Sequence, residues 1–201
     1  MNNFHSINLV RIDNQSHLFI DAVGVEFSVF QHESFIDGGD EIVGRLEGYT
    51  PYDSNSIFNA ILLEQQIIGV MRVIYPDDRG FGSFKTINDF PESLCNLESV
   101  RPENIVEIGT LAILPQFRGK KLAFLLYHQV VKQNHDYWLA SVDAQLLKSF
   151  QKFGFIFEPI GPTKFYMGSP TTPVIFYIGK TIKHLKKFMP QVYRKVVLGE
   201  F

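Results

Sequence analysis

A single carboxylate, Glu107, stands within the apolar stretch from Ile105 to Leu114 (IVEIGTLAIL). The β-branched residues of this stretch predict a buried strand, and Pro115 predicts its end, because proline cannot donate a hydrogen bond to a sheet. Burial disfavours the charged form of a carboxyl group and would raise the pKa of Glu107 toward the range of a general base. A second interpretation is that Glu107 is the structural partner of an arginine, and the two roles are compatible.

A basic turn, RGKK at residues 118–121, follows this strand and leads into the sequence LAFLLYHQVVKQN. The spacing of the apolar residues from Leu122 onward predicts an amphipathic helix. The first backbone N–H groups of a helix lack partners within the helix and lie at the positive end of its dipole. The turn therefore predicts a phosphate-binding site, to which the three basic side chains add full charges.

Strand, basic turn and helix in this order resemble motif A of the GNAT acyltransferases, whose turn holds the pyrophosphate of an acyl-thioester cofactor. Lys121 stands where the family pattern has its second small residue. The resemblance implies that Glu107 removes a proton from the attacking amine. It implies that the main chain at Leu111, Ala112 and Ile113 pairs with the pantetheine arm and polarises the thioester carbonyl. It also implies the phosphate-binding residues Gln116, Arg118, Gly119, Lys120, Lys121, Leu122 and Ala123.

A second pattern resembles the acyl-homoserine-lactone synthases and the long-chain N-acyl amino acid synthases, whose fold is a GNAT variant. Asp53, the run Gly69 to Arg72, Phe90-Pro91 and Glu107 follow the order of that pattern, and the resemblance covers roughly residues 18–180. It implies that Arg72, with Asp53, holds the polar end of the acceptor. Arg72 lies in an otherwise apolar strand and must be paired if it is buried, so a purely structural ion pair is the alternative.

The chain departs from these families at three positions. Glu26 and Thr110 stand where arginine is expected, which weighs against lactone synthesis. Phe150 stands where many GNAT acetyltransferases have a tyrosine near the leaving thiolate, and a phenyl ring can donate no proton. Either water or another group supplies that proton, or this branch dispenses with the acid. We predict that Phe150 belongs to the substrate site, where it favours a medium or long acyl chain.

The whole chain predicts an α/β fold, with a GNAT-like mixed, mostly antiparallel sheet of about seven strands and helices on both faces. Further strands are expected at 4–12, 59–64, 67–75, 137–142, 155–160, 164–167 and 174–178, with a turn at Gln65-Gln66. Helices are expected at 18–35, at 144–153 between an Asp143 cap and Gly154, and at 181–198, split by Pro190. The polar stretch 37–56 is either a solvated loop or a binding loop.

Residues 1–180 are expected to form the acyltransferase domain. Residues 181–201 would form a basic amphipathic helical extension, packed on this domain or appended to it. Its alternatives are docking an acidic protein partner, such as acyl carrier protein, or lying on a membrane surface, which is not favoured.

Composition excludes several classes of protein. A formal net charge of −2 argues against a dedicated nucleic-acid binder. The single Cys95 forbids an intrachain disulfide, and no signal peptide or bilayer-length apolar run is seen, so we expect a cytoplasmic protein. No base is visible that would activate Cys95 as a nucleophile. The six histidines show no metal-ligand spacing, and we expect no metal.

The sequence thus predicts an N-acyltransferase whose donor is acyl-coenzyme A or acyl carrier protein and whose acceptor is a small amine such as an amino acid. Two alternatives remain open. One is an ordinary acetyl-coenzyme A-dependent acetyltransferase, and the other is a non-catalytic module that binds an acyl thioester.

Overall fold

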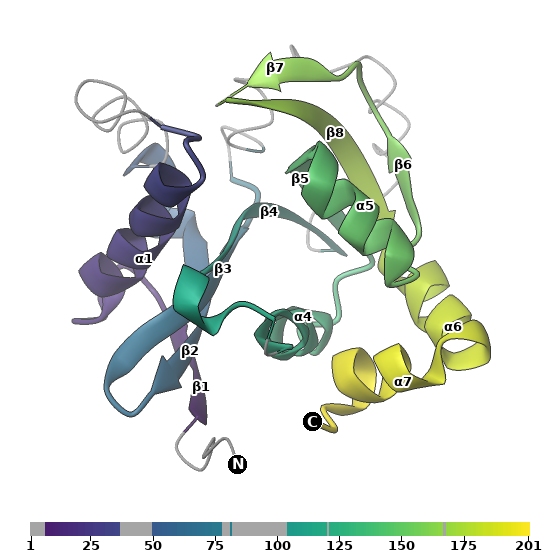
Figure 1. Ribbon diagram of the computed structural model, residues 1–201, viewed down its shortest axis with the longest axis horizontal. Coiled ribbons are helices and arrows are strands. Elements are labelled where there is room, and N and C mark those ends of the chain that lie inside the picture. Colours follow the sequence, from purple (N-terminus) through teal and green to yellow (C-terminus); the bar gives the residue numbers. More distant parts are fainter. Residues whose placement is uncertain (1–6, 37–49, 78–80, 82–103, 120, 167) are drawn as a thin grey trace.

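The computed structural model describes residues 7–36, 50–77, 81, 104–119, 121–166 and 168–201 (Figure 1). Several predictions lie outside these residues: the first part of the strand at 4–12, most of the loop at 37–56, Phe90-Pro91, Cys95 and Lys120. The predicted α/β class is confirmed. The described residues form one mixed sheet of eight strands, where about seven were expected, in the order β1-β2-β3-β4-β5-β8-β6, with β7 paired to β8.

The first half of the sheet is an antiparallel run of four strands. These are β1 (Ile7–Ile12), β2 (Ser56–Leu63), β3 (Gln66–Ile74) and β4 (Ile105–Ile113). The second half contains β5 (Tyr137–Asp143), β6 (Phe157–Pro159), β7 (Lys164–Tyr166) and β8 (Ser169–Tyr177), also antiparallel. The two halves meet in the parallel pair β4–β5, as the helical crossover between these strands requires.

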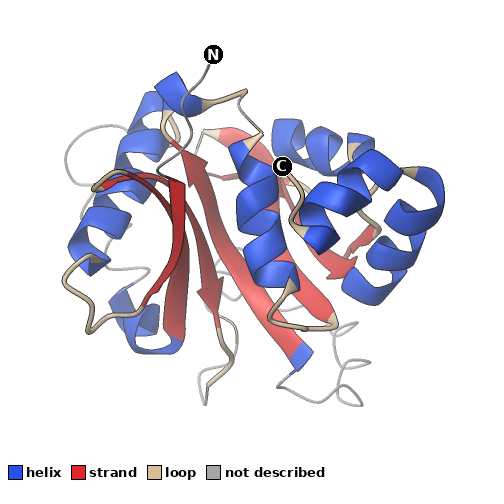
Figure 2. Cartoon of the chain, turned by 90° about the horizontal axis from the view of Figure 1, so that it is seen from below, coloured by secondary structure: helices blue, strands red, loops and turns tan. Residues whose placement is uncertain are grey.

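Helices cover both faces of the sheet, as predicted (Figure 2). Helix α1 (Phe19–His32) buries Ala22, Val25 and Val29 against one face of β2, β3 and β4. Helices α4 (Leu122–Val131) and α5 (Ala144–Lys152) pack on the opposite face, in the larger core cluster. Asp143 caps α5 as expected, since its carboxylate accepts hydrogen bonds from the N–H groups of Gln145 (2.8 Å) and Leu146 (3.0 Å).

The C-terminal segment breaks at the predicted proline. Helix α6 (Ile178–Phe188) ends before α7 (Pro190–Tyr193), which continues into a π-helical turn, Arg194–Leu198. Leu185 and Val196 are buried in the same core cluster as α4. The Val196 carbonyl lies 3.1 Å from Nδ1 of His128 on α4, so this segment packs on the sheet domain.

Three details differ from the sequence-based expectation. The β2–β3 turn consists of Glu64 and Gln65, and Gln66 already belongs to β3. Ile61 pairs with Gly69 while Leu62 pairs with Ile67, so Ile68 is an extra residue in β3. Ile68 packs in the larger core cluster, whereas Val70 packs in the cluster under α1. Strand β8 begins at Ser169 rather than at residue 174, although it contains two prolines.

Candidate active site

The site is organised by the place where β4 and β5 separate. Their parallel ladder ends at the pair Ile108–Ala140. Beyond it β4 continues to Ile113 with β3 as its only strand neighbour among the described residues, while β5 stays paired to β8 as far as Asp143. The β5-facing edge of β4 is therefore available to a ligand that can bond to main-chain groups.

A cleft of about 650 Å³ opens at this separation. Apolar side chains from both halves of the sheet supply much of its wall, including Val29, Phe30, Phe35, Leu111, Ile113, Leu146 and Phe153. The turn before β8 closes one side, where Gly168 lies so near the end of α1 that a Cβ would come within 2.6 Å of the Ser34 carbonyl. The cleft thus combines apolar side chains with polar ones, such as Glu33 and Arg118, next to an open strand edge.

The basic turn lies beside this cleft. Gly119 (φ +75°) and Lys121 (φ +63°) both adopt the left-handed conformation, and Lys121 is the residue before the first turn of α4. Lys121 thus adopts a backbone conformation that glycine reaches at a lower steric cost than lysine. Arg118 lines the cleft, donates to the Ile113 carbonyl (3.2 Å) and forms an ion pair with Glu33. The positive end of α4 and these basic side chains can hold an anion.

Glu107 lies on β4 just before an irregularity. It is fully buried (0% exposed). Arg72 pairs with Thr110 and Val73 with Ile108, so Gly109 is an extra residue that distorts β4 two residues before Leu111. The distorted strand thus lies at the inner end of the free edge of β4, and the basic turn lies at its outer end. Glu107 itself is still paired with Leu139 of β5 and is not among the residues that line the cleft.

Arg72 occupies the centre of a buried polar cluster. It is 1% exposed, and its guanidinium lies 2.6 Å from Asp53 and 3.7 Å from Glu26. It also donates to Ser56 (2.9 Å) and lies over the Phe58 ring. Thr110 in turn donates a hydrogen bond to Glu26. The two residues at which the chain departs from the lactone-synthase pattern are thus in contact with each other.

Phe150 lies in the core rather than among the residues that line the cleft. Its ring packs on Phe176 (4.8 Å between centroids) and on Tyr127 of α4 (5.4 Å). Tyr127 itself lines the cleft, and burial raises the pKa of its phenol. The sequence gives no functional signal at Tyr127, because this residue stands in the apolar repeat of α4 like a core residue.

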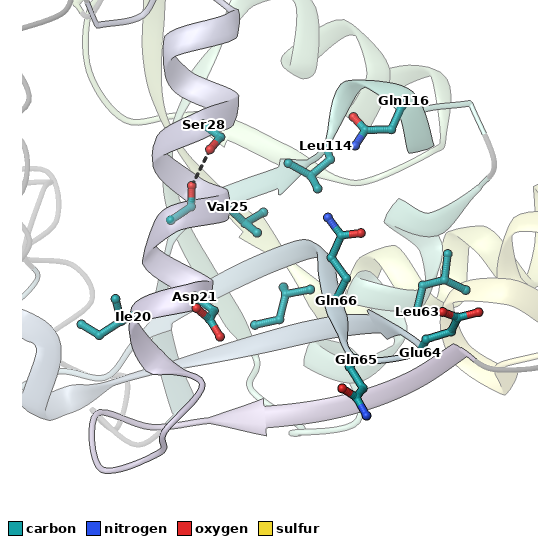
Figure 3. Close-up of a pocket in the computed structure, with 12 residues that line it drawn as sticks. Ile20, Asp21, Val25, Ser28, Leu63, Glu64, Gln65, Gln66, Leu114 and Gln116 are labelled. Carbon is teal, nitrogen blue, oxygen red and sulfur yellow. Dashed lines mark hydrogen bonds between the residues drawn. The ribbon is translucent and has the colours of Figure 1, made fainter.

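The remaining predicted cofactor residues differ in their surroundings. Ala123 lines the cleft, whereas Ala112 and Leu122 are buried in the core. Gln116, in the short 3₁₀ helix Pro115–Phe117, lines a second hollow of about 1180 Å³ between α1 and the β2–β3 turn. Figure 3 shows Gln116 and Gln66 at this hollow, and neither residue lines the cleft.

Within the described residues, no group of three or more His, Cys, Asp or Glu side chains could hold a metal ion. No helix of the described part combines the length and apolar character needed to cross a membrane.

The eight-stranded sheet with helices on both faces has the GNAT fold, since the structure is similar to that of an acetyltransferase of the GNAT family from Desulfovibrio desulfuricans (TM-score 0.53, 13% identity, 86% of this chain and 99% of that chain). The structure is similar to that of the coenzyme A-dependent acyl-homoserine lactone synthase BjaI, solved with SAM and isopentyl-CoA (TM-score 0.62, 16% identity, 93% of this chain and 90% of that chain). It is also similar to FeeM, an N-acyl amino acid synthase from uncultured soil microbes (TM-score 0.63, 15% identity, 92% of this chain and 99% of that chain). Tetrahymena GCN5 is similar as well, with a TM-score of 0.53 and 18% identity over 86% of this chain and 96% of that chain.

The predicted resemblance to the lactone synthases and the acyl amino acid synthases is confirmed at the level of the fold. By sequence, no family model matches the chain, and no curated protein matches it either.

Proposed function

We propose that the protein is an N-acyltransferase that moves an acyl group from an acyl thioester to the amine of a small molecule. The observation that carries this proposal is the cleft where β4 and β5 separate, with the basic turn at the outer end of the free strand edge. Glu107 lies in the paired part of β4, two residues before the extra residue Gly109. A thioester on a phosphopantetheine arm has the matching parts in the same order: phosphate, an amide-bearing chain and a reactive carbonyl.

In this reaction Glu107 takes a proton from the acceptor amine, which is protonated at neutral pH and cannot attack until it is neutral. The amine nitrogen then attacks the thioester carbonyl. Main-chain N–H groups of the distorted strand, from Gly109 to Ile113, stabilise the negative charge on the carbonyl oxygen. The carbon–sulfur bond breaks, the nitrogen passes its remaining surplus proton through water to the departing thiolate, and the thiol and the new amide are released.

For the acceptor we propose a small amine such as an amino acid, held at the polar cluster. The Asp53 side chain is 28% exposed while that of Arg72 is 1% exposed. Asp53 would therefore meet the acceptor, and Arg72 would hold Asp53 in position.

For the donor we propose a medium or long acyl chain, carried by coenzyme A or by acyl carrier protein. The apolar lining of the cleft supports this choice. Each buried methylene contributes roughly 0.8 kcal/mol, so four added carbons raise kcat/KM by about two orders of magnitude if the cleft accepts them.

The test compares acetyl and octanoyl thioesters, on coenzyme A and on acyl carrier protein, with a panel of amino acids and other small amines. Free thiol and acylated amine are measured together, so that hydrolysis is told apart from transfer. Efficiency should rise with chain length. A maximum with acetyl-coenzyme A would instead identify an ordinary acetyltransferase, and stoichiometric binding without thiol release would identify a non-catalytic module.

A further inference from the structure

The polar cluster around Arg72 has a surplus of negative charge. The Arg72 guanidinium lies 2.6 Å from Asp53 and 3.7 Å from Glu26, and it donates to the neutral hydroxyl of Ser56 (2.9 Å). Two carboxylates thus share one guanidinium, so the three charged side chains together carry a formal charge of −1 at neutral pH. A cluster with this charge favours a cation over an anion as its ligand.

The surplus charge is accessible at Asp53. Glu26 is 4% exposed and accepts a hydrogen bond from Thr110, so its carboxylate lies inside the fold. The Asp53 side chain is 28% exposed and comes from the short 3₁₀ helix Thr50–Asn55. Because Arg72 is shared with Glu26, it neutralises the Asp53 carboxylate only in part. Asp53 therefore offers a ligand a carboxylate that keeps part of its charge.

The cluster lies on the same face of the sheet as Glu107. Along β3, Arg72 and Ile74 point to the same face. Their partners in β4 are Thr110 and Glu107, respectively. Arg72 and Glu107 are therefore diagonal neighbours on this face, roughly 7–8 Å apart. An acceptor of a few carbon atoms can thus contact Asp53 while its amine lies near Glu107.

The cluster and the reaction make opposite demands on a single nitrogen. A carboxylate next to an amine favours the protonated form of that amine. The attacking nitrogen must instead be neutral, because only then does it have a free electron pair. A nitrogen that binds to Asp53 is therefore poorly suited to attack, and the attack falls to a second nitrogen of the same molecule.

We propose that the acceptor carries two amino groups, of which one is acylated and the other binds to Asp53 as an ammonium ion. This inference rests on the proposed function and narrows its acceptor to small diamines and basic amino acids. The ammonium ion at Asp53 keeps its protons throughout the reaction. Glu26 is the residue that sets this choice. An arginine at its position, as in the lactone-synthase pattern, would give the cluster a formal charge of +1 and would repel a second ammonium ion.

The first experiment compares acceptors that differ only in the second amino group: 1,5-diaminopentane with pentylamine, and lysine with norleucine. With octanoyl-coenzyme A as donor, kcat/KM should be about 10–100-fold higher for the diamino member of each pair. Most of this preference should be lost in Asp53→Asn. The ratio does not depend on the fraction of folded enzyme, because both acceptors meet the same protein. Asp21→Asn, which removes a carboxylate of α1 outside the cluster, is the matched control and should keep the wild-type ratio.

The second experiment needs no turnover, since it measures binding of 1,5-diaminopentane by calorimetry in the presence of coenzyme A. The affinity should fall about tenfold in Asp53→Asn. Glu26→Gln still accepts from the Thr110 hydroxyl but makes the cluster formally neutral, so it should weaken binding as well. It serves as the test if Asp53→Asn does not fold.

Equal kcat/KM for both members of each pair would overturn the inference and leave the proposed acyl transfer standing. Unchanged binding of the diamine in Asp53→Asn and Glu26→Gln would also overturn it. Binding of the diamine that depends on Asp53, without any acylated product, would instead contradict the proposed function and leave the ammonium site standing.

Discussion

Arg118, at the basic turn, forms an ion pair with Glu33 at the end of α1. The two side chains come from different elements, and both line the cleft. A phosphate group that binds at the turn must compete with this carboxylate for the same guanidinium. If the turn binds the donor as proposed, this contact couples donor binding to the position of α1.

Glu33→Gln should bind coenzyme A about 3- to 10-fold more tightly than the wild type, since it removes one negative charge next to the phosphate site. The gain should shrink at high salt, because both side chains are partly exposed and screened. Calorimetric titration at two ionic strengths measures both effects. The control is Glu200→Gln, which breaks the exposed Arg194–Glu200 pair of the C-terminal segment and should leave binding unchanged.

Glu107→Gln should lower kcat by about 10²–10⁴-fold, the usual cost of losing a general base, with donor affinity nearly unchanged. The rise of the rate with pH should disappear together with the carboxylate. Steady-state rates between pH 5 and 9 test both expectations. A Glu107→Gln enzyme with wild-type rates would make the residue structural only.

Valine has nearly the same shape as threonine but no hydroxyl. Thr110→Val should therefore destabilise the fold by about 1–3 kcal/mol, because the buried Glu26 carboxylate loses a hydrogen-bond donor. Thr110→Ser keeps the hydroxyl and serves as the matched variant, with a smaller loss. Urea denaturation of the three proteins gives the free energies of unfolding. Equal stability of Thr110→Val and the wild type would mean that this contact does not hold the polar cluster.

Lys121→Gly should separate the geometry of the basic turn from its charge. At φ +63° the lysine side chain is strained, so glycine should stabilise the fold by about 0.5–1 kcal/mol. Coenzyme A binding should weaken all the same, because a positive charge is lost. Lys121→Ala removes the charge but keeps the strain, and it should be less stable than Lys121→Gly. If Lys121→Ala were more stable than Lys121→Gly, the left-handed backbone at residue 121 would not be a source of strain.

Alkaline stability should depend on Tyr127. Burial raises the pKa of its phenol above the value of about 10 that it has in the unfolded chain. Between these two values the unfolded chain releases its proton first, so stability is fully present below pH ~10 and is lost as the pH rises beyond it. Tyr127→Phe should therefore lose stability less steeply above pH ~10. Urea midpoints between pH 8 and 11.5 test this, with Tyr193→Phe as the control.

The central strand could be predicted from the sequence because its signals are local. The apolar run from Ile105 ends at Pro115, and Asp143 caps α5 through its own side chain. Strand β8 was predicted too short because Pro170 and Pro173 argue against a strand. They are tolerated because proline still accepts hydrogen bonds, as Pro173 does from the N–H of Ile160 (2.9 Å).

The candidate site was harder to predict because its contacts join residues far apart in the chain. Glu26 and Thr110 are 84 positions apart, and Glu33 and Arg118 are 85 positions apart. No periodicity in a single sequence links such pairs. Tyr127 was missed for a different reason: in an apolar helical repeat, a tyrosine that packs with its ring gives the same signal as one that also presents its hydroxyl to a cleft.

The separation of β4 from β5 also bears on how substrate preference can diverge. The groups along the edge of β4 are main-chain N–H and C=O, which every residue except proline supplies alike. Substitutions at Leu111 or Ile113 can reshape the cleft wall while this hydrogen-bonding edge stays in place. Substitutions therefore change the selectivity of such a cleft more readily than its capacity to hold an extended ligand arm. This is one way in which chains that share 15 or 16% of their residues keep a common architecture.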